Sequence, residues 1–327
     1  MQYGETGKLI RGVGGLYEIA LDAGDTPLSG RRISARAKGN FRHEGVTPLV
    51  GDRVRIAFDE AILTKNEQGE LCPLGDGGGA VIEEILPRKN ALIRPPMANL
   101  DLLFITFAAA HPAPALETVD KLISIAEYNG IEPVIVIGKQ DMDPTYAQEL
   151  QELYTAAGFS AFALSAGTGE GVDALRTYLS AAMAGKTAAF AGASGVGKST
   201  LLNVLFPGLC LQTGEISRRI ERGRHTTRRV ELYPLTELQD AYVADTPGFS
   251  MLDFVRFDFF AKEDLAGTVR EFEPYIGACR YKKCTHTREE GCAILEAVRE
   301  GRIAPSRHQS YVTMFDALKN KHDWSKK

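Results

Sequence analysis

Apolar and polar residues alternate in short stretches over residues 1–86, the pattern of β-strands with one buried face. Residues 53–58 and 80–86 are two such stretches, and each follows a turn that contains glycine. About five strands of this kind in roughly 85 residues predict a small barrel. The glycines within residues 12–15 lead into a strand and lack the third glycine of a dinucleotide-binding loop, so they predict a turn.

After Pro87 the pattern changes to apolar runs that alternate with helical segments. Residues 100–110 and 131–138 are nearly continuous apolar runs, typical of strands buried on both faces of a parallel sheet. Residues 115–130 lie between these runs, repeat apolar side chains at helical spacing and end on a glycine. The alternation of strand and helix predicts an α/β domain.

These changes of pattern divide the chain into three predicted domains. A single core rarely grows beyond about 250–300 residues, and the chain has 327. We expect a barrel over residues 1–87, an α/β domain over residues 88–264, and a helical, cysteine-rich domain over residues 265–327.

Composition and charge exclude several classes of protein. Hydrophobic residues make up 44% of the chain and charged residues 24%, which excludes a disordered, collagen-like or purely coiled-coil protein. The net charge is −4, yet residues 279–327 hold eleven Lys/Arg against six Asp/Glu. A basic tail on an acidic body favours a polyanionic partner, although a solvated surface would carry the same charges. The sequence has neither a long apolar run nor an apolar leader, so we expect a cytoplasmic protein without a membrane partner.

Residues 192–199 have the spacing of a P-loop, Gly-x4-Gly-Lys-Ser, between a predicted strand and a predicted helix. Its glycines let the backbone wrap a phosphate at the positive end of the helix. Lys198 supplies charge to the β- and γ-phosphates, and Ser199 supplies a hydroxyl ligand to Mg²⁺. The predicted phosphate-binding residues are Gly192, Ala193, Ser194, Gly195, Val196, Gly197, Lys198, Ser199 and Thr200.

A candidate base-reading sequence, Gly138-Lys139-Gln140-Asp141, follows an apolar strand and is similar to the guanine-reading pattern Asn-Lys-x-Asp. Asp141 can accept hydrogen bonds from N1–H and the 2-amino group of guanine, and Lys139 can stack its stem over the base. Gly138 lacks the amide that would bond the base and tether the P-loop. Ser165 and Ala166 follow the next strand, where GTPases place another motif of the base site, and this favours guanine recognition.

A candidate magnesium and γ-phosphate motif, Asp245-Thr-Pro-Gly248, follows the last predicted strand. Asp245 can hold Mg²⁺ through water, and the Gly248 amide can sense the γ-phosphate. The base-reading residues precede the P-loop here, whereas in ordinary GTPases they follow it. The order therefore predicts a circular permutation in which the switch strand comes last, next to the cysteine-rich region.

Residues 218–229, between the P-loop and Asp245, contain six arginines and one glutamate. This density fits contact with RNA phosphates as well as a solvated loop. Either Thr226 or Thr227 is the expected Mg²⁺ ligand of the GTP state. Phe249 stands where a glutamine would orient the attacking water, so another group must do so. His225 is the nearest candidate in sequence, and a partner or a bound monovalent cation is the alternative.

Four metal-ligand residues occur within fourteen positions near the C-terminus: Cys279, Cys284, His286 and Cys292. Three thiolates and one imidazole form the tetrahedral set that zinc prefers in structural sites. Disulfides do not fit a reducing cytosol or an odd number of cysteines. We therefore expect one structural zinc ion.

Taken together, these motifs resemble the RsgA family of small ribosomal subunit biogenesis GTPases, also called YjeQ or YloQ, over nearly the whole chain. The segments that carry the resemblance, besides the cysteine cluster, are VGDRV (50–54), RPPMANLD (94–101), GASGVGKST (192–200), QTGEIS (212–217), GRHTT (223–227), DTPGF (245–249) and GCAI (291–294).

The resemblance implies an N-terminal OB barrel, a circularly permuted GTPase domain and a C-terminal zinc domain. It also implies a late role in maturation of the 30S subunit, with GTP hydrolysis to GDP and phosphate stimulated by that subunit. The expected ligands are GTP or GDP with Mg²⁺, and the expected partner is the 30S subunit with its 16S rRNA, bound through the barrel and the zinc domain. We expect a monomer.

Two other classes of protein are compatible with parts of the sequence. A P-loop enzyme that uses ATP, such as a small kinase, would not need the Lys139–Asp141 and Ser165–Ala166 pairs. An RNA-binding assembly scaffold with weak or degenerate hydrolysis is favoured by Gly138 and Phe249. Competition of ATP against GTP tests the first class, and phosphate release with 30S subunits tests the second.

Overall fold

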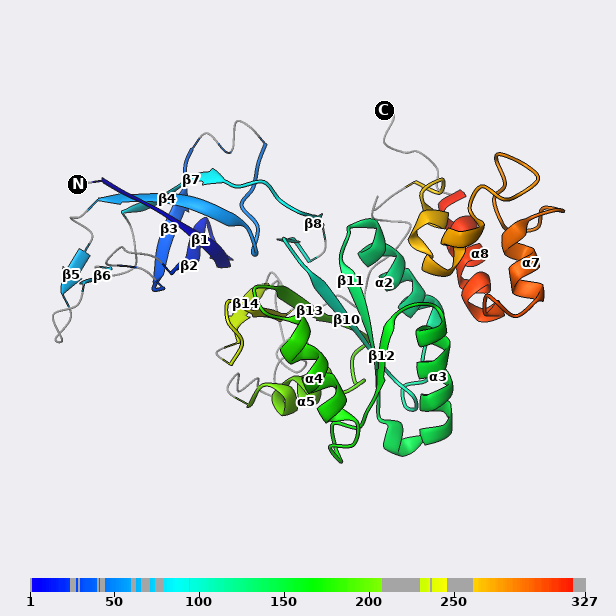
Figure 1. Cartoon of the computed structure of the whole chain (residues 1–327). Helices are drawn as coiled ribbons and strands as arrows, with labels where there is room; N and C mark the ends of the chain where they lie inside the picture. Colours follow the sequence, from blue (N-terminus) through cyan, green and yellow to red (C-terminus); the bar gives the residue numbers. More distant parts are fainter. Residues whose placement is uncertain are drawn as a thin grey trace, which may run out of the picture. The chain divides into compact units, whose positions relative to one another are not determined.

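Figure 1 shows the computed structural model of the chain. The structure describes residues 2–23, 28, 30–39, 41, 45–59, 63–65, 71–73, 79–93, 95–207, 230–235, 237–245 and 261–319. The chain forms two compact units. The first contains Met1–Leu100, Ala184–Ala189 and His225–Pro247, and the second contains Asp101–Met183, Phe190–Arg224 and Gly248–Lys327.

A five-stranded barrel forms most of the first unit. β1 pairs with β2 on one side and with β4 on the other, so the sheet order β1-β2-β3-β7-β4 closes on itself. All pairings are antiparallel except that of β3 with β7. Leu9, Ile19 and Ile56 are fully buried, as alternation of inward and outward residues requires. The strands are β1 (Gln2–Val13), β2 (Leu16–Leu21), β3 (Arg32–Ala37), β4 (Arg53–Asp59) and β7 (Ala80–Ile85).

Three further strands follow the barrel in the order of the sheet, and the last of them, β13 (Thr187–Ala191), begins in the first unit and ends in the second. β14 (Glu231–Pro234) pairs with β1 at Arg11↔Glu231 and lies antiparallel to β15 (Tyr242–Asp245). β13 is parallel to β15, with Ala189 opposite Ala244. Two short hairpins complete the described strands: β5 (Leu63–Lys65) with β6 (Leu71–Pro73), and β8 (Ala91–Leu92) with β9 (Met97–Ala98).

A buried ion pair joins the VGDRV segment (50–54) to the segment that follows β7. The Asp52 carboxylate is fully buried, and it accepts hydrogen bonds from Nε and Nη2 of Arg88 at 2.7 and 2.8 Å. Its neighbour Gly51 has φ +94°, and a Cβ there would lie 2.0 Å from the carbonyl oxygen of Ala98. Asn99 donates to the carbonyl oxygen of Gly51 at 3.0 Å. Two of the segments that carry the family resemblance therefore form one junction.

The second unit has a parallel sheet in the order β12-β11-β10, with helices on both sides (Figure 1). All seven residues of β10 are buried, which explains its continuous apolar run. α2 and α3 lie on one side of these strands and α4 on the other. The elements are β10 (Leu102–Ala108), α2 (Leu116–Tyr128), β11 (Glu132–Gly138), η2 (Gln140–Met142), α3 (Pro144–Ala156), β12 (Ser160–Ala163), α4 (Val172–Ala182) and α5 (Lys198–Leu205).

The C-terminal part of the second unit is helical, as predicted, and packs on α2 through η5 and α8. Its elements are η5 (Leu265–Thr268), η6 (Arg270–Tyr275), α7 (Ala293–Arg299) and α8 (Pro305–Lys319). Among the described residues, no helix is long and apolar enough to cross a membrane.

We predict that Arg88→Met lowers the free energy of unfolding of the barrel by about 3 kcal/mol, because it leaves the buried Asp52 carboxylate without its counter-charge. Denaturant unfolding followed by hydrogen exchange in β1 and β4 measures this. The control is Arg55→Met, which removes an exposed pair with Glu84 and should cost below about 1 kcal/mol. Equal losses in both variants would contradict a structural role for the buried pair.

Candidate functional site

The P-loop lies between β13 and α5, as the sequence predicts. Gly192 has φ +149°, and a Cβ there would lie 1.9 Å from the carbonyl oxygen of Thr106, so β10 leaves room for glycine alone. Gly195 and Gly197 also have positive φ, +80° and +97°, and Gly197 precedes the first turn of α5. The glycines therefore shape a loop whose exposed part, residues 193–195, precedes a helix N-terminus.

The ammonium group of Lys198 lies across this loop. Its Nζ donates hydrogen bonds to the carbonyl oxygens of Gly192 and Ala193, at 2.6 and 2.8 Å. Ser199 follows in the first turn of α5 and is half-buried. Backbone N–H groups, a helix N-terminus and a nearby ammonium together form an anion site suited to the phosphates of a nucleotide.

Gly138, the last residue of β11, lies against the P-loop. A Cβ at Gly138 would lie 3.3 Å from the carbonyl oxygen of Val196 and 3.6 Å from that of Phe107. The predicted base-reading segment therefore starts beside the phosphate loop. An amide on an asparagine at this position would have the Val196 carbonyl oxygen within hydrogen-bond reach, and glycine offers no such link between the two loops.

The rest of the base-reading segment lies beside the loop that carries Ser165. Gln140 donates its backbone N–H to the carbonyl oxygen of Leu164 at 3.1 Å. Ser165 is 2% exposed, and its Oγ accepts the backbone N–H of Thr168 at 3.2 Å. The Asp141 side chain is exposed and so is available to a ligand.

Lys139 has a left-handed backbone, φ +57°, and its ammonium group donates to the carbonyl oxygen of His111. His111 lies in the turn after β10, and Ala109 of the same turn donates to the carbonyl oxygen of Gly138 at 2.9 Å. No motif in the sequence marks this turn. Its position after a buried parallel strand was the available signal, because such strands end at one edge of the sheet.

The remaining predicted site residues belong to the switch segments. Asp245 ends β15, and its backbone is paired with Glu231 of β14. His225, Thr226, Thr227 and Gly248 lie outside the described residues, as does the whole arginine-rich segment 218–229.

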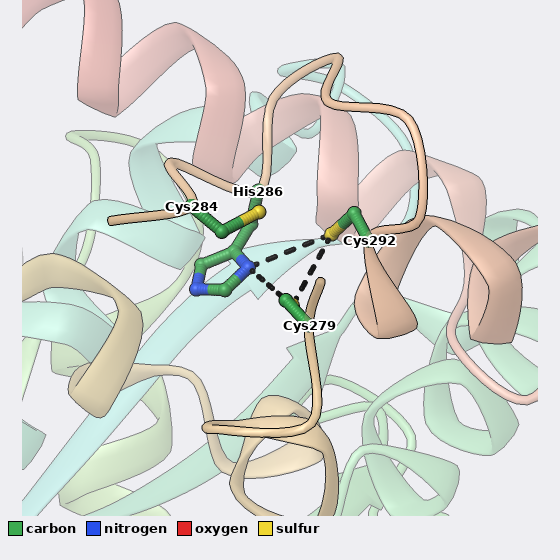
Figure 2. Close-up of side chains that lie close together, drawn as sticks. All are labelled: Cys279, Cys284, His286 and Cys292. Atoms are coloured by element: carbon green, nitrogen blue, oxygen red, sulfur yellow. Dashed lines mark hydrogen bonds between the residues drawn. The ribbon is translucent and has the colours of Figure 1, made fainter. Parts of the chain in front are cut away.

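The four predicted metal ligands form one cluster, and Figure 2 shows their side chains pointing toward a common centre. All four ligand atoms lie within 4.8 Å of one another. His286 Nδ1 is 3.5 Å from Sγ of Cys279 and 3.5 Å from Sγ of Cys292, and these two sulfurs are 3.8 Å apart. A set of three sulfurs and one nitrogen at this separation fits a tetrahedral metal ion.

Burial affects the protonation of these ligands. It raises the pKa of Cys284 to about 12 and also raises the pKa of Cys292, because the thiolate loses hydration. Burial lowers the pKa of His286, which keeps its imidazole neutral and able to ligate. A divalent cation would stabilise the thiolates and release their protons on binding.

Glu289 organises the loop that carries His286. Its carboxylate accepts the backbone N–H of Thr285 at 2.8 Å, of Thr287 at 3.0 Å and of Arg288 at 3.1 Å. Burial alone would raise the pKa of Glu289, but the hydrogen bonds from Thr285 and the loop amides outweigh it and lower the pKa to about 2. This carboxylate therefore stays ionised and holds the loop in the ligating conformation.

The RsgA GTPase family model matches residues 85–255, and the model of the RsgA N-terminal domain matches residues 6–63. The chain belongs to the RsgA GTPase family. The small ribosomal subunit biogenesis GTPase RsgA of Caldanaerobacter subterraneus is 41% identical over 316 residues, which cover 96% of each chain. The protein of the same name from Agathobacter rectalis is 37% identical over 324 residues, covering 98% of this chain and all of the relative.

Solved structures agree with this membership. The crystal structure of YjeQ from Thermotoga maritima aligns with a TM-score of 0.76 at 32% identity, covering 98% of this chain and 100% of that one. The structure of YloQ, described as a circularly permuted GTPase, aligns with a TM-score of 0.72 at 30% identity, covering 98% and 96%. The predicted RsgA fold class, a barrel followed by a permuted GTPase domain and a helical metal region, is confirmed.

We predict that Gly138→Asn tightens binding of GDP by about 0.5–1.5 kcal/mol, because the new amide can donate to the Val196 carbonyl. Titration with fluorescent GDP measures the change. Gly138→Ala is the matched control, since it adds the same Cβ without an amide and should give no gain. If the Asn variant binds no more tightly than the Ala variant, the amide link plays no part in this RsgA protein.

We predict that Glu289→Ala weakens metal binding by about 10–100-fold, because it removes the carboxylate that orders the ligand loop. Competition with a chromophoric chelator measures the affinity. The control is Glu290→Ala, which changes the exposed neighbour and should leave the affinity unchanged. Equal affinity in the two variants would show that the loop is held without Glu289.

Proposed function

We propose that this protein binds GTP with Mg²⁺, hydrolyses it to GDP and phosphate, and acts in biogenesis of the small ribosomal subunit. The observation that carries the proposal is that three predicted nucleotide loops meet in one compact unit. The base-reading segment contacts the P-loop where Gly138 lies beside Val196. It also contacts the loop of Ser165, because Gln140 donates a backbone hydrogen bond to Leu164. Membership of the RsgA GTPase family supports the activity, and the names of the curated relatives support the biological role.

The phosphate side of the site is assigned to the P-loop. The backbone of residues 192–198 would bind the phosphate oxygens, and Lys198 would move from its carbonyl partners to the β- and γ-phosphates. Ser199 would ligate Mg²⁺, together with Thr226 or Thr227 and, through water, Asp245. Gly248 would respond to the γ-phosphate, and His225 is proposed to orient the attacking water.

The base side is assigned to Asp141 and its neighbours. An exposed carboxylate at this place can accept N1–H and the 2-amino group of guanine together, and adenine offers no such pair of donors. Lys139 would lie over the base, fixed at its far end by the carbonyl of His111. Ser165 and Ala166 would close the opposite side through their backbone.

The metal cluster is proposed to hold one structural zinc ion. Three thiolates and one imidazole suit zinc better than magnesium or calcium, which prefer oxygen ligands. Its role would be to fix the C-terminal loops, because four protein ligands complete a tetrahedral site and leave no open position for a substrate.

The partners are proposed to be the small subunit and its 16S rRNA, in the cytoplasm, with the protein acting as a monomer. Arg280, Lys282 and Lys283 are all exposed beside the metal ligands and could bind RNA phosphates. The barrel is proposed to supply a second RNA-binding surface, because the OB fold is one that binds oligonucleotides in many proteins.

We predict that adding purified 30S subunits accelerates GTP hydrolysis by the wild-type protein, and that Lys198→Ala lowers the stimulated rate by at least about 100-fold through loss of charge on the transferred phosphoryl group. Phosphate release measures both. The control is Lys186→Ala, at an exposed lysine before β13, which should keep the wild-type rate. Hydrolysis that 30S subunits do not stimulate would favour the assembly scaffold.

A further inference from the structure

The C-terminal region and the helices next to the base-reading loops share a buried cluster of charged groups. Arg307, in the first turn of α8, is 4% exposed. Its guanidinium is paired with Asp120 of α2, and its Nε lies 2.7 Å from Oε1 of Glu271 in η6. The hydroxyl of Tyr154, near the end of α3, donates to Oδ1 of Asp120 at 3.1 Å. Side chains from α2, α3, η6 and α8 therefore meet at one site.

The same part of α8 holds the backbone of the metal-ligand loop. His308, the residue after Arg307, places Nε2 2.7 Å from the carbonyl oxygen of His286. The hydroxyl of Tyr311, one turn further along, donates to the carbonyl oxygen of Thr285 at 2.8 Å. A change in the position of this loop would therefore act on the helix that carries Arg307.

The other side of the cluster leads to the base-reading loops. α2, which carries Asp120, begins after the turn whose His111 carbonyl accepts the ammonium group of Lys139. α3, which carries Tyr154, begins at Pro144, directly after the segment that contains Asp141. The two helices bound by the cluster thus start at the two loops that would surround the base.

Arg270 is a second arginine of the C-terminal region that forms ion pairs with the elements next to the base-reading loops. Its Nε lies 2.6 Å from Glu127 in the last turn of α2, and its Nη2 lies 2.6 Å from Glu132 at the start of β11. Its guanidinium is 4.7 Å from the ring centre of Phe159, beyond α3. Arg270 therefore contacts the last turn of α2 and the segment after α3. Arg307 contacts the first half of α2 at Asp120, which in turn accepts the hydroxyl of Tyr154 in the last turn of α3.

We infer that Arg307 is a positioning residue for the guanine site, and that it couples metal binding at the cysteine cluster to the affinity for guanine nucleotides. The inference rests on the proposed nucleotide and metal sites and adds a thermodynamic link between them. Separating the partners of a buried ion cluster is costly, so a displacement of α8 would be passed on to α2 through Arg307 and Asp120. By linkage, bound metal tightens nucleotide binding by the same factor by which nucleotide tightens metal binding.

The wild-type protein tests the link without any substitution. GDP affinity is measured by titration of fluorescent GDP at constant Mg²⁺, before and after removal of the metal with a chelator selective for zinc, and metal content is determined on the same samples. We expect removal to weaken GDP binding by about fivefold or more, the lower end of measured allosteric couplings. Hydrogen exchange should rise in α2 and α3 as well as near the cysteines.

Substitutions of Arg307 and Tyr311 test whether these residues connect the metal site to the nucleotide site. Arg307→Met should weaken GDP binding in the metal-loaded protein and reduce the response to metal removal to about twofold or less. Tyr311→Phe, which removes a single hydroxyl from the metal side, should reduce the response while leaving the loaded affinity close to wild type. The control is Arg302→Met, at an exposed arginine of the same region paired with Glu300, which should behave as wild type. A tetrahedral cobalt spectrum of each variant shows that its metal site is intact.

The outcomes separate this inference from the proposed function. If the protein binds both the metal ion and GDP, and its GDP affinity is the same with and without the metal, the link is wrong and both proposed sites remain supported. A wild-type response that persists in Arg307→Met would overturn the role of Arg307. Absence of metal in the purified, reduced protein would refute the proposed metal site. Absence of GDP binding would refute the proposed nucleotide site. Either result would also refute the link between the two sites.

Discussion

Close backbone contact between glycines and their neighbours is the constraint on which the nucleotide site depends. Gly192 lies so near the carbonyl oxygen of Thr106 that no side chain fits, and Gly138 lies against the carbonyl of Val196. These contacts hold the phosphate loop against the ends of β10 and β11. Phe104 of β10 also stacks on Phe190, two residues before the P-loop, with ring centres 4.7 Å apart. Loops that are distant in the sequence are thereby fixed side by side.

This constraint explains why the changed order of motifs leaves the site intact. Parallel strands present their carboxyl ends at one edge, whichever strand the chain enters first. Here it passes through β10, β11 and β12 before it reaches β13 and the P-loop. The changed order instead determines which segment comes after the switch strand β15, and the next described segment is the region that carries the metal ligands.

The sequence predicted local features better than long-range ones. The P-loop and the four metal ligands were found because their spacing is short and their chemistry is specific. The barrel and the α/β alternation followed from periodicity. The pair of Arg307 with Asp120 joins residues 187 positions apart, and no pattern in a single sequence indicates such a contact. The same holds for the junction of Asp52 with Arg88, and for the turn at His111, whose contribution is a backbone carbonyl.

The central claim is that the permuted segment around Asp141 reads guanine beside a P-loop that comes later in the chain. Affinities of Asp141→Asn for GDP and xanthosine diphosphate test it most directly, with Asp173→Asn, at an exposed carboxylate of α4, as the control. Loss of a hydrogen bond to a charged acceptor, worth about 1.5–3 kcal/mol, predicts weaker GDP binding and a preference shifted toward the xanthine nucleotide. An unchanged ratio of the two affinities would contradict the assignment of this segment to the base.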